Sequence, residues 1–146
     1  MAANKFEEDT MESDFRLDPS KVETAYRAWS IGIGGSILSS PSVVDDMIVF
    51  GCNDTFVYAL DKDGSKVWSY RTGGTVFSSP TCYKNYIVVG SSDGFLYTLS
   101  ADRELKWKFL TGGKVWATPF IAEGVVYFGS NTGIFYALSI EDGKEL

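Results

Sequence analysis

Four side chains of this sequence offer oxygen atoms that could bind a cation, namely Asn53, Asp54, Asp93 and Asn131. Carboxylate and amide oxygens are the ligands that Ca²⁺ takes in proteins. All four residues lie in short polar segments between apolar runs, where Asn and Asp also form turns by hydrogen bonding to their own backbone. We therefore expect turn-forming side chains here, with a calcium site as the alternative.

Histidine is absent from all 146 residues. Its absence excludes nucleophilic sites that need a Ser–His or Cys–His pair, and it excludes metal sites built on imidazole. The sequence assigns no catalytic residue and no metal ligand. We therefore expect a protein that is not an enzyme and that carries no cofactor.

An internal repeat contains these polar segments. Trp29, Trp68 and Trp107 follow one another at intervals of 39 residues. The same frame contains GGSILSSP, GGTVFSSP and GGKVWATP, then MIVFG, YIVVG and VVYFG, and then FVYAL, FLYTL and IFYAL. A period near 40 indicates an architecture in which each unit has the same structure and packs on its neighbours.

Each repeat contains four short runs rich in β-branched and aromatic residues, separated by turn residues such as Asp63-Gly64. Such runs are typical of β-strands, and tight turns require neighbouring strands to pair antiparallel. In the first repeat the strands are predicted at 40–44, 47–51, 56–61 and 66–70. Four strands in about 40 residues are typical of one β-propeller blade, so the predicted fold is all-β.

The repeats divide the chain into segments. Residues 1–24 are predicted to form an acidic polar arm that is partly disordered, and residues 25–146 the propeller repeats. Within the repeats we expect a strand at 25–31, blades at 38–71 and 77–110, and a partial blade at 116–146. Three blades are fewer than the usual four to eight of a closed ring. The ring is therefore incomplete unless the chain oligomerises or belongs to a longer propeller.

The glycine pair that opens each repeat, such as Gly73-Gly74, is predicted to supply a positive-φ turn from one blade to the next. The Ser-Ser-Pro or Ala-Thr-Pro that follows begins the inner strand. One hairpin turn, Cys52 to Thr55, lacks the glycine found at Gly94 and Gly133, which predicts strain or a different turn type. The predicted channel-mouth surface comprises Ser40, Asn53, Asp54, Ser78, Ser79, Asp93, Trp116, Thr118 and Asn131.

Trp116 occupies the repeat position of Leu38 and Phe77, at the start of an inner strand. It could line the channel mouth, although packing is its expected role, and the other repeated tryptophans are expected to pack between blades. Cys52 and Cys82 occupy different repeat positions, so we expect no disulfide and a buried, unreactive Cys82.

The net charge of −6 repels phosphate backbones and anionic membrane surfaces, so nucleic acid is not an expected partner. No apolar run approaches the roughly 18 residues of a membrane span, so membrane insertion is not expected either. The first residues, MAANKFEEDT, lack the pattern of a secretory signal. We therefore expect a cytoplasmic protein with free thiols.

The segments DGSKVWSYRTGGTVFSSP and VVGSSDGFLYTL resemble the pyrroloquinoline-quinone-like β-propeller repeats of quinoprotein dehydrogenases and outer-membrane assembly lipoproteins. The resemblance covers about residues 25–146 and implies a propeller fold. In the dehydrogenases it also implies a larger ring, with calcium held by Glu, Asn and Asp and often a disulfide between adjacent cysteines. None of these features is recognisable in this sequence, so no catalytic residue is carried over.

The expected function is a non-enzymatic scaffold or binding module for a protein or peptide partner. One alternative is a fragment or homologue of a pyrroloquinoline quinone-dependent dehydrogenase, with the quinone and calcium as cofactors, and another is a small-ligand sensor. The partner could also be a second copy. Two chains would then form a six-bladed ring in which each donates its strand at 25–31 to the last blade of the other.

Overall fold

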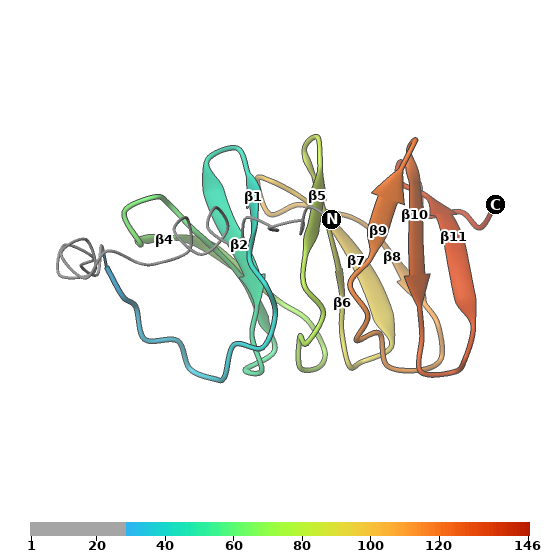
Figure 1. The fold of residues 1–146 in the computed structure, drawn as a ribbon, viewed down its shortest axis with the longest axis horizontal. Helices are drawn as coiled ribbons and strands as arrows, with labels where there is room; N and C mark the ends of the chain where they lie inside the picture. The colour runs from blue at the N-terminus through green and yellow to red at the C-terminus, as the bar shows by residue number, and fades with distance from the viewer. Residues whose placement is uncertain (1–28) are drawn as a thin grey trace, which may run out of the picture. The chain divides into compact units, whose positions relative to one another are not determined.

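β-Strands form nearly all the regular structure in the computed structural model, which describes residues 29–146. Residues 31–146 form one compact unit. Within that unit three antiparallel sheets follow one another in chain order (Figure 1). The part of the chain that the structure describes contains no helix long and apolar enough to cross a membrane.

Two sheets have four strands, and the third has three. Blade 1 comprises β1 (Ser42–Val44), β2 (Met47–Gly51), β3 (Phe56–Leu60) and β4 (Lys66–Arg71). Blade 2 comprises β5 (Thr81–Tyr83), β6 (Tyr86–Gly90), β7 (Phe95–Ser100) and β8 (Leu105–Leu110). Blade 3 comprises β9 (Phe120–Ala122), β10 (Val125–Gly129) and β11 (Phe135–Ser139).

The blades repeat in detail as well as in outline. In each sheet the strands pair with their chain neighbours in antiparallel register. The pairing of β3 with β4 shifts register between Ala59 and Leu60, and the pairing of β7 with β8 shifts between Thr98 and Leu99 at the same repeat position. The predicted all-β fold of antiparallel blades is therefore confirmed, with an unclosed ring.

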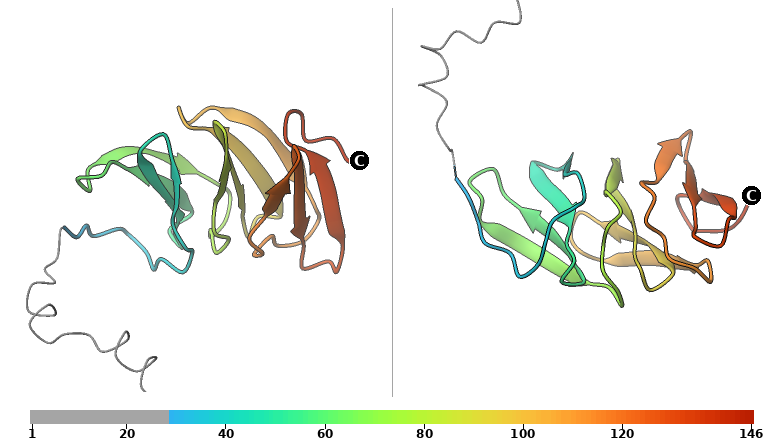
Figure 2. Two further views of the ribbon diagram at one scale, coloured as in Figure 1. Left: turned by 45° about the horizontal axis from the view of Figure 1, so that its top comes forward. Right: turned by 60° about the horizontal axis from the view of Figure 1, so that its bottom comes forward.

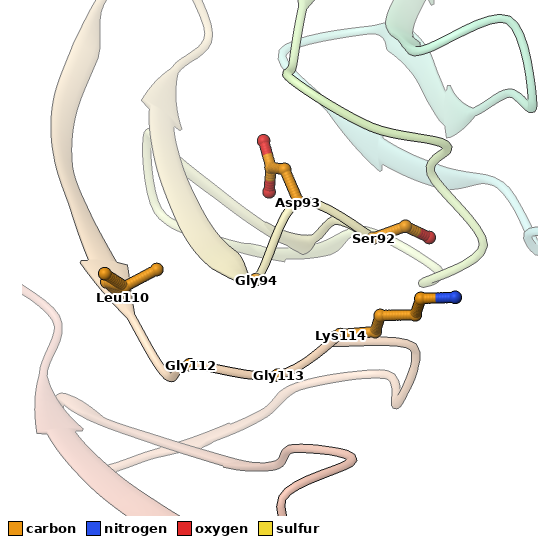
Figure 3. Close-up of a pocket in the computed structure, with 7 residues that line it drawn as sticks. All are labelled: Ser92, Asp93, Gly94, Leu110, Gly112, Gly113 and Lys114. Atoms are coloured by element: carbon orange, nitrogen blue, oxygen red, sulfur yellow. The ribbon is translucent and has the colours of Figure 1, made fainter.

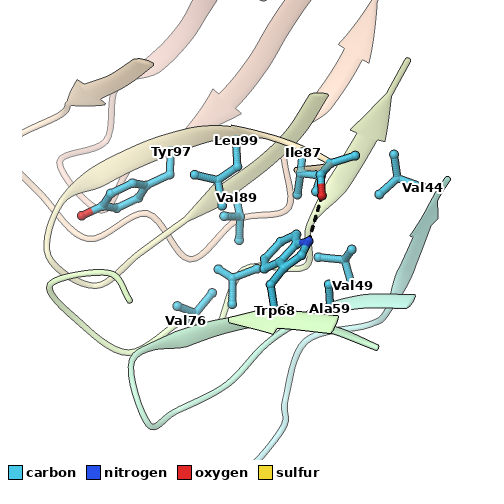
Figure 4. Packing of buried hydrophobic residues seen from close by; sticks show 11 residues of the cluster. Val44, Val49, Ala59, Trp68, Val76, Ile87, Val89, Tyr97 and Leu99 are labelled. Carbon is cyan, nitrogen blue, oxygen red and sulfur yellow. Dashed lines mark hydrogen bonds between the residues drawn. The ribbon is translucent and has the colours of Figure 1, made fainter. Parts of the chain in front are cut away.

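Successive sheets stand side by side (Figure 2). Two buried apolar clusters lie between the blades. The first joins Val49, Val57 and Trp68 of blade 1 to Ile87 and Leu99 of blade 2. Trp68 is only 8% exposed and donates its indole N–H to the carbonyl of Ala101 at 2.8 Å (Figure 4). The second cluster joins blades 2 and 3 in the same way. Trp68 and Trp107 therefore pack between blades, as their sequence positions predicted, whereas Trp29 is 38% exposed.

Hydrogen bonds between the inner segments connect equivalent positions of successive repeats. The amide of Ser40 donates to the hydroxyl of Ser79 at 2.8 Å, 39 residues away. The hydroxyl of Ser78 donates to the carbonyl of Ala117 at 2.9 Å, again 39 residues away. The hydroxyl of Thr81 donates to the carbonyl of Pro119 at 2.6 Å. The Ser-Ser-Pro segments therefore join neighbouring blades.

The glycine pairs were predicted to supply positive-φ turns between blades, and this prediction is wrong for two of the three pairs. Among these pairs only Gly112 has a positive φ, at +79°. The second glycine is needed instead because the next blade approaches too closely for a side chain. A Cβ at Gly74 would lie 2.6 Å from the amide nitrogen of Asp93, and one at Gly35 would lie 2.8 Å from that of Asp54. Real Cβ contacts are essentially never that short.

The edges of the repeat region differ from the predicted segments in part. The predicted arm at 1–24 and residues 25–28 of the predicted first strand lie outside the described residues. Residues 29–31 are described and are not in a strand. In blade 3 the fourth-strand position begins with an isolated bridge between Leu138 and Glu145.

Candidate functional site

The candidate site lies on the face of the repeat unit that carries the β2–β3, β6–β7 and β10–β11 turns, which we call the turn face. The linkers between blades, residues 72–76 and 111–115, run along this face. The amide of Thr72 donates to the carbonyl of Thr55 in blade 1, and the amide of Ser92 in blade 2 donates to the carbonyl of Thr75, both at 2.9 Å. Each linker is thus held between two turns.

An aspartate organises the turn in blade 2. One carboxylate oxygen of Asp93 accepts a hydrogen bond from the amide of Phe95 at 3.0 Å. The other accepts from the hydroxyl of Tyr97 at 2.6 Å and from the amide of Gly73 at 2.7 Å. Burial and the bond to this carboxylate raise the pKa of Tyr97. We call this arrangement the aspartate lock, because it fastens the turn to the incoming linker.

Blade 1 repeats most of this lock. Asp54 accepts from the amide of Phe56 at 3.1 Å and from the hydroxyl of Tyr58 at 2.6 Å. Burial and that bond raise the pKa of Tyr58 to about 12. Both carboxylates therefore act as turn-forming groups within their own blades. Within residues 29–146 no three acidic or cysteine side chains come together as a group that could hold a metal ion.

Blade 3 lacks the aspartate, because Thr132 occupies the position of Asp93. The hydroxyl of Thr132 donates to the hydroxyl of Ser130 at 3.2 Å. Tyr136, which stands in the place of Tyr97, donates to the carbonyl of Thr111 at a longer 3.3 Å. The replacement is visible when the three repeats are aligned, but residue type alone does not indicate that the aspartates bond to the linker.

Blade 1 differs in another residue of the same turn. Thr55 has a φ of +82°, close to the +92° of Gly94 and the +82° of Gly133. A β-branched residue rarely adopts a positive φ. The turn type is therefore preserved, and the predicted strain falls on Thr55.

The predicted channel-mouth hydroxyls do not form one free surface. Ser78 and Ser79 bond to neighbouring blades, as does the backbone of Ser40. Asn53 donates its side-chain N–H to the hydroxyl of Ser36 at 2.7 Å. Thr118 and Asn131 are exposed, and Asn131 donates its backbone N–H to the carbonyl of Lys114 at 2.9 Å.

Trp116 is the one aromatic residue of the predicted set, and 42% of its surface is accessible. Its indole N–H donates to the hydroxyl of Ser92 at 2.8 Å, which fixes the ring beside the β6–β7 turn. Its ring meets that of Phe77 edge to face, with centroids 5.6 Å apart. The ammonium of Lys114 lies 5.0 Å from the ring centroid. These contacts hold a large aromatic surface and a cation together on the turn face.

A shallow pocket of about 230 Å³ adjoins this cluster. Its walls are the β6–β7 turn and the following linker, with Leu110 on one side. Figure 3 shows the side chains of Asp93 and Lys114 extending to different sides of the backbone. The lining residues are Ser92, Asp93, Gly94, Leu110, Gly112, Gly113 and Lys114.

Both cysteines are free. Cys52 is buried, and its thiol lies 3.6 Å from the carbonyl oxygen of Ser36. Cys82 was predicted to be buried, and the structure leaves it partly buried. Burial nevertheless raises the pKa of the Cys82 thiol to about 11, so the thiol is protonated at neutral pH.

The repeats can be compared with known families. The family described as outer membrane protein assembly factor BamB matches residues 20–103 and 72–146. The chain belongs to the BamB family. No curated protein matches the sequence.

Solved structures show the same BamB-like fold. BamB from Moraxella catarrhalis is 20% identical, with a TM-score of 0.71 over 80% of this chain. The computationally designed Ika4 protein is 16% identical, with a TM-score of 0.71 over 79% of this chain and 72% of its own length. The quinohemoprotein alcohol dehydrogenase ADHIIG from Pseudomonas putida HK5 is 23% identical, with a TM-score of 0.69 over 79% of this chain.

The chain spans 38% of the length of the M. catarrhalis BamB and 20% of that of the alcohol dehydrogenase. At these identities the likeness shows the fold alone. The fold is therefore shared by an assembly factor, a designed protein and an enzyme, and the function of this chain has to be argued from its own surface.

Proposed function

We propose that this chain is a non-enzymatic propeller module that binds a protein or peptide partner on its turn face. The observation that carries the proposal is the exposed Trp116, held by Ser92 and flanked by Phe77 and Lys114. Aromatic residues fixed beside a pocket are typical of binding hot spots, because they bury a large area and lose little conformational entropy.

The reactive groups of the turn face support binding rather than catalysis. The carboxylates of Asp54 and Asp93 accept hydrogen bonds from their own turns, and the tyrosines bonded to them have raised pKa values. The two cysteines are free and lie at different repeat positions. These thiols also support our proposal that the module works in a reducing compartment such as the cytoplasm.

A peptide selection followed by affinity measurement tests the proposal. Peptides selected for binding to the full chain are expected to lose about tenfold or more in affinity with Trp116→Ala, as at other aromatic hot spots. The matched control is Leu105→Ala, because Leu105 is also 42% exposed but lies at the start of β8. Equal affinity of both variants, or no selected peptide, would contradict the proposal.

A titration with pyrroloquinoline quinone, with and without Ca²⁺, tests the dehydrogenase alternative. Tryptophan fluorescence is the readout, since Trp116 contacts Ser92 and Lys114, which line the pocket. We expect no saturable change. A saturable, calcium-dependent change would favour the dehydrogenase fragment over the binding module.

Self-association is a second form of partner binding that the structure supports. The outward face of blade 3 exposes 65% of Phe120 and 72% of Phe135. The corresponding face of blade 2 is covered by blade 3. We propose that a second copy covers this face, which predicts a dimeric mass in light scattering. A folded monomer at micromolar concentration would contradict self-association. A dimer that survives deletion of residues 1–31 would contradict the predicted exchange of the strand at 25–31 between two chains.

A further inference from the structure

We propose that the β10–β11 turn of blade 3 binds a carboxylate group of the partner, at the position where blades 1 and 2 carry an aspartate of their own. The proposal deepens the proposed function and rests on it, because it names the chemistry that the turn face recognises. The ligand class is a carboxylate, either from an acidic side chain or from the C-terminus of a peptide.

Blade 2 shows what such a site requires. Three donors converge on the carboxylate of Asp93, namely the amides of Gly73 and Phe95 and the hydroxyl of Tyr97. One donor comes from the linker, one from the turn and one from the following strand. This set satisfies both carboxylate oxygens with hydrogen bonds of 2.6 to 3.0 Å.

Blade 3 retains the same three donors without the carboxylate. Gly112, Ile134 and Tyr136 occupy the positions of Gly73, Phe95 and Tyr97. No described residue accepts a hydrogen bond from the amide of Gly112 or Ile134. The hydroxyl of Tyr136 reaches only the carbonyl of Thr111, at 3.3 Å. Thr111 directly precedes Gly112, so this hydroxyl lies beside the linker.

The position is open to a ligand. Gly112, Thr132 and Ile134 are all exposed, and a Cβ built on Gly112 meets no atom within 4 Å. The hydroxyl of Thr132 bonds to Ser130 in its own turn and so leaves the amides of Gly112 and Ile134 free for another group.

Two further features of the linker bear on how it would receive an anion. Gly112 has a φ of +79°, whereas Gly73, which bonds the aspartate, does not have a positive φ. Because glycine adopts both conformations at little cost, the linker can adjust to a bound carboxylate. Lys114 lies two residues further along the same linker, and its ammonium lies 5.0 Å from the ring centroid of Trp116. Hydrogen bonds to an ionised carboxylate are about twice as strong as neutral ones.

An acetate titration followed by ¹⁵N–¹H NMR of the full chain tests the site directly. We expect the amide signals of Gly112 and Ile134 to shift and saturate. Those of Gly73 and Phe95 should stay in place, because Asp93 already occupies their acceptor site. Sodium chloride at equal ionic strength is the control. No saturable shift at Gly112 and Ile134, or equal shifts at all four amides, would overturn the proposal.

Two variants sharpen the test. Thr132→Asp places a carboxylate in the turn, so the acetate response of Gly112 and Ile134 should be lost. Tyr136→Phe removes one donor and should weaken acetate binding without supplying a competitor. If either folded variant binds acetate like the natural chain, the site is wrongly placed.

Peptides that bind the turn face distinguish the two sources of the carboxylate. Amidation of the C-terminus lowers affinity if the terminal group binds, and Asp→Asn or Glu→Gln substitution lowers it if a side chain binds. If neither change lowers peptide affinity while acetate still shifts the amide signal of Gly112, the peptide binds another part of the turn face and its carboxylate does not occupy this site. If peptides bind and acetate does not, the carboxylate site alone is wrong.

Discussion

The interface between blades 1 and 2 and the interface between blades 2 and 3 have the same backbone contacts and different side chains. In both, a tryptophan indole donates to a carbonyl 33 residues ahead, from Trp68 to Ala101 and from Trp107 to Ile140, each at 2.8 Å. In both, the linker bonds to the turns on either side. The comparison teaches which contacts the repeat needs and which it can replace.

The first interface relies on a buried tryptophan, Trp68, and on the aspartate lock. The second has a partly exposed Trp107 and no lock, but it gathers the rings of Phe109, Phe128 and Tyr136, with centroids 5.1 to 6.4 Å apart. Aromatic pairs at these separations stabilise a protein beyond the area they bury. Ring packing in the second interface therefore takes the place of the aspartate hydrogen bonds that stabilise the first.

The largest difference is expected from the tryptophans. Trp68→Ala should lower the free energy of unfolding by about 3–5 kcal/mol, because it leaves a cavity and an unpaired carbonyl between blades. Trp107→Ala should cost less, because its ring is partly exposed. Urea denaturation followed by circular dichroism measures both, with Trp116→Ala as the control for an exposed ring. A larger loss from Trp107→Ala would reverse the ranking of the interfaces.

The aspartate lock is expected to contribute next. Asp93→Asn should destabilise the fold by about 1–3 kcal/mol at neutral pH, because it weakens hydrogen bonds to a charged group. Thr132→Asn, at the same position of blade 3, should change stability by about 0.5 kcal/mol or less. Equal effects of the two substitutions would mean that the lock is dispensable.

The lock also predicts a dependence on pH. The folded pKa of Tyr58 lies at about 12, above the ordinary value of 10.0, and that of Tyr97 is raised as well. Unfolded tyrosines release protons first, so this contribution to stability is complete below about pH 10 and is lost as pH rises towards 12. The free energy of unfolding, measured by denaturation at several alkaline pH values, should fall less steeply with pH for Asp54→Asn than for the natural chain.

One substitution at the interface between blades 2 and 3 is expected to stabilise the protein, by less than the tryptophan substitutions destabilise it. Thr98 is fully buried, its hydroxyl has no hydrogen-bond partner among the described residues, and alanine stands at its position in the other repeats. Thr98→Val should therefore stabilise the protein by about 1–2 kcal/mol. Thr81→Val is the matched control, because the Thr81 hydroxyl is bonded to Pro119 and its removal should destabilise. Thermal unfolding shows whether each variant raises or lowers the stability of the protein.

The smallest expected effect concerns the strained turn of blade 1. Thr55→Gly should raise stability by about 1 kcal/mol, because glycine removes the steric cost of a positive φ but adds flexibility to the unfolded chain. Gly94→Thr, at the equivalent turn of blade 2, should lower it. A loss on Thr55→Gly would show that the threonine side chain is itself needed in the turn.

The sequence predicted the fold well because the repeat presents each strand, turn and tryptophan three times or nearly so. The role of Trp68 followed from its spacing alone. The site was harder to predict, because the hydroxyls of Ser78 and Ser79 look like surface groups until their partners 39 residues away are known. The role of the glycine pairs was also missed, since close approach of Asp93 to Gly74 depends on how blades pack.

The hydrogen bonds that join equivalent positions of successive repeats have a consequence for how such a chain can change in length. Ser40 meets Ser79, and Trp68 meets Ala101 as Trp107 meets Ile140. Excision of a whole 39-residue unit would therefore bring Trp68 against the surface that now receives Trp107. Duplication or loss of one unit in the gene would keep these hydrogen bonds at the new boundary and would change only which apolar side chains meet there, so repeat number can vary by recombination with the backbone contacts preserved.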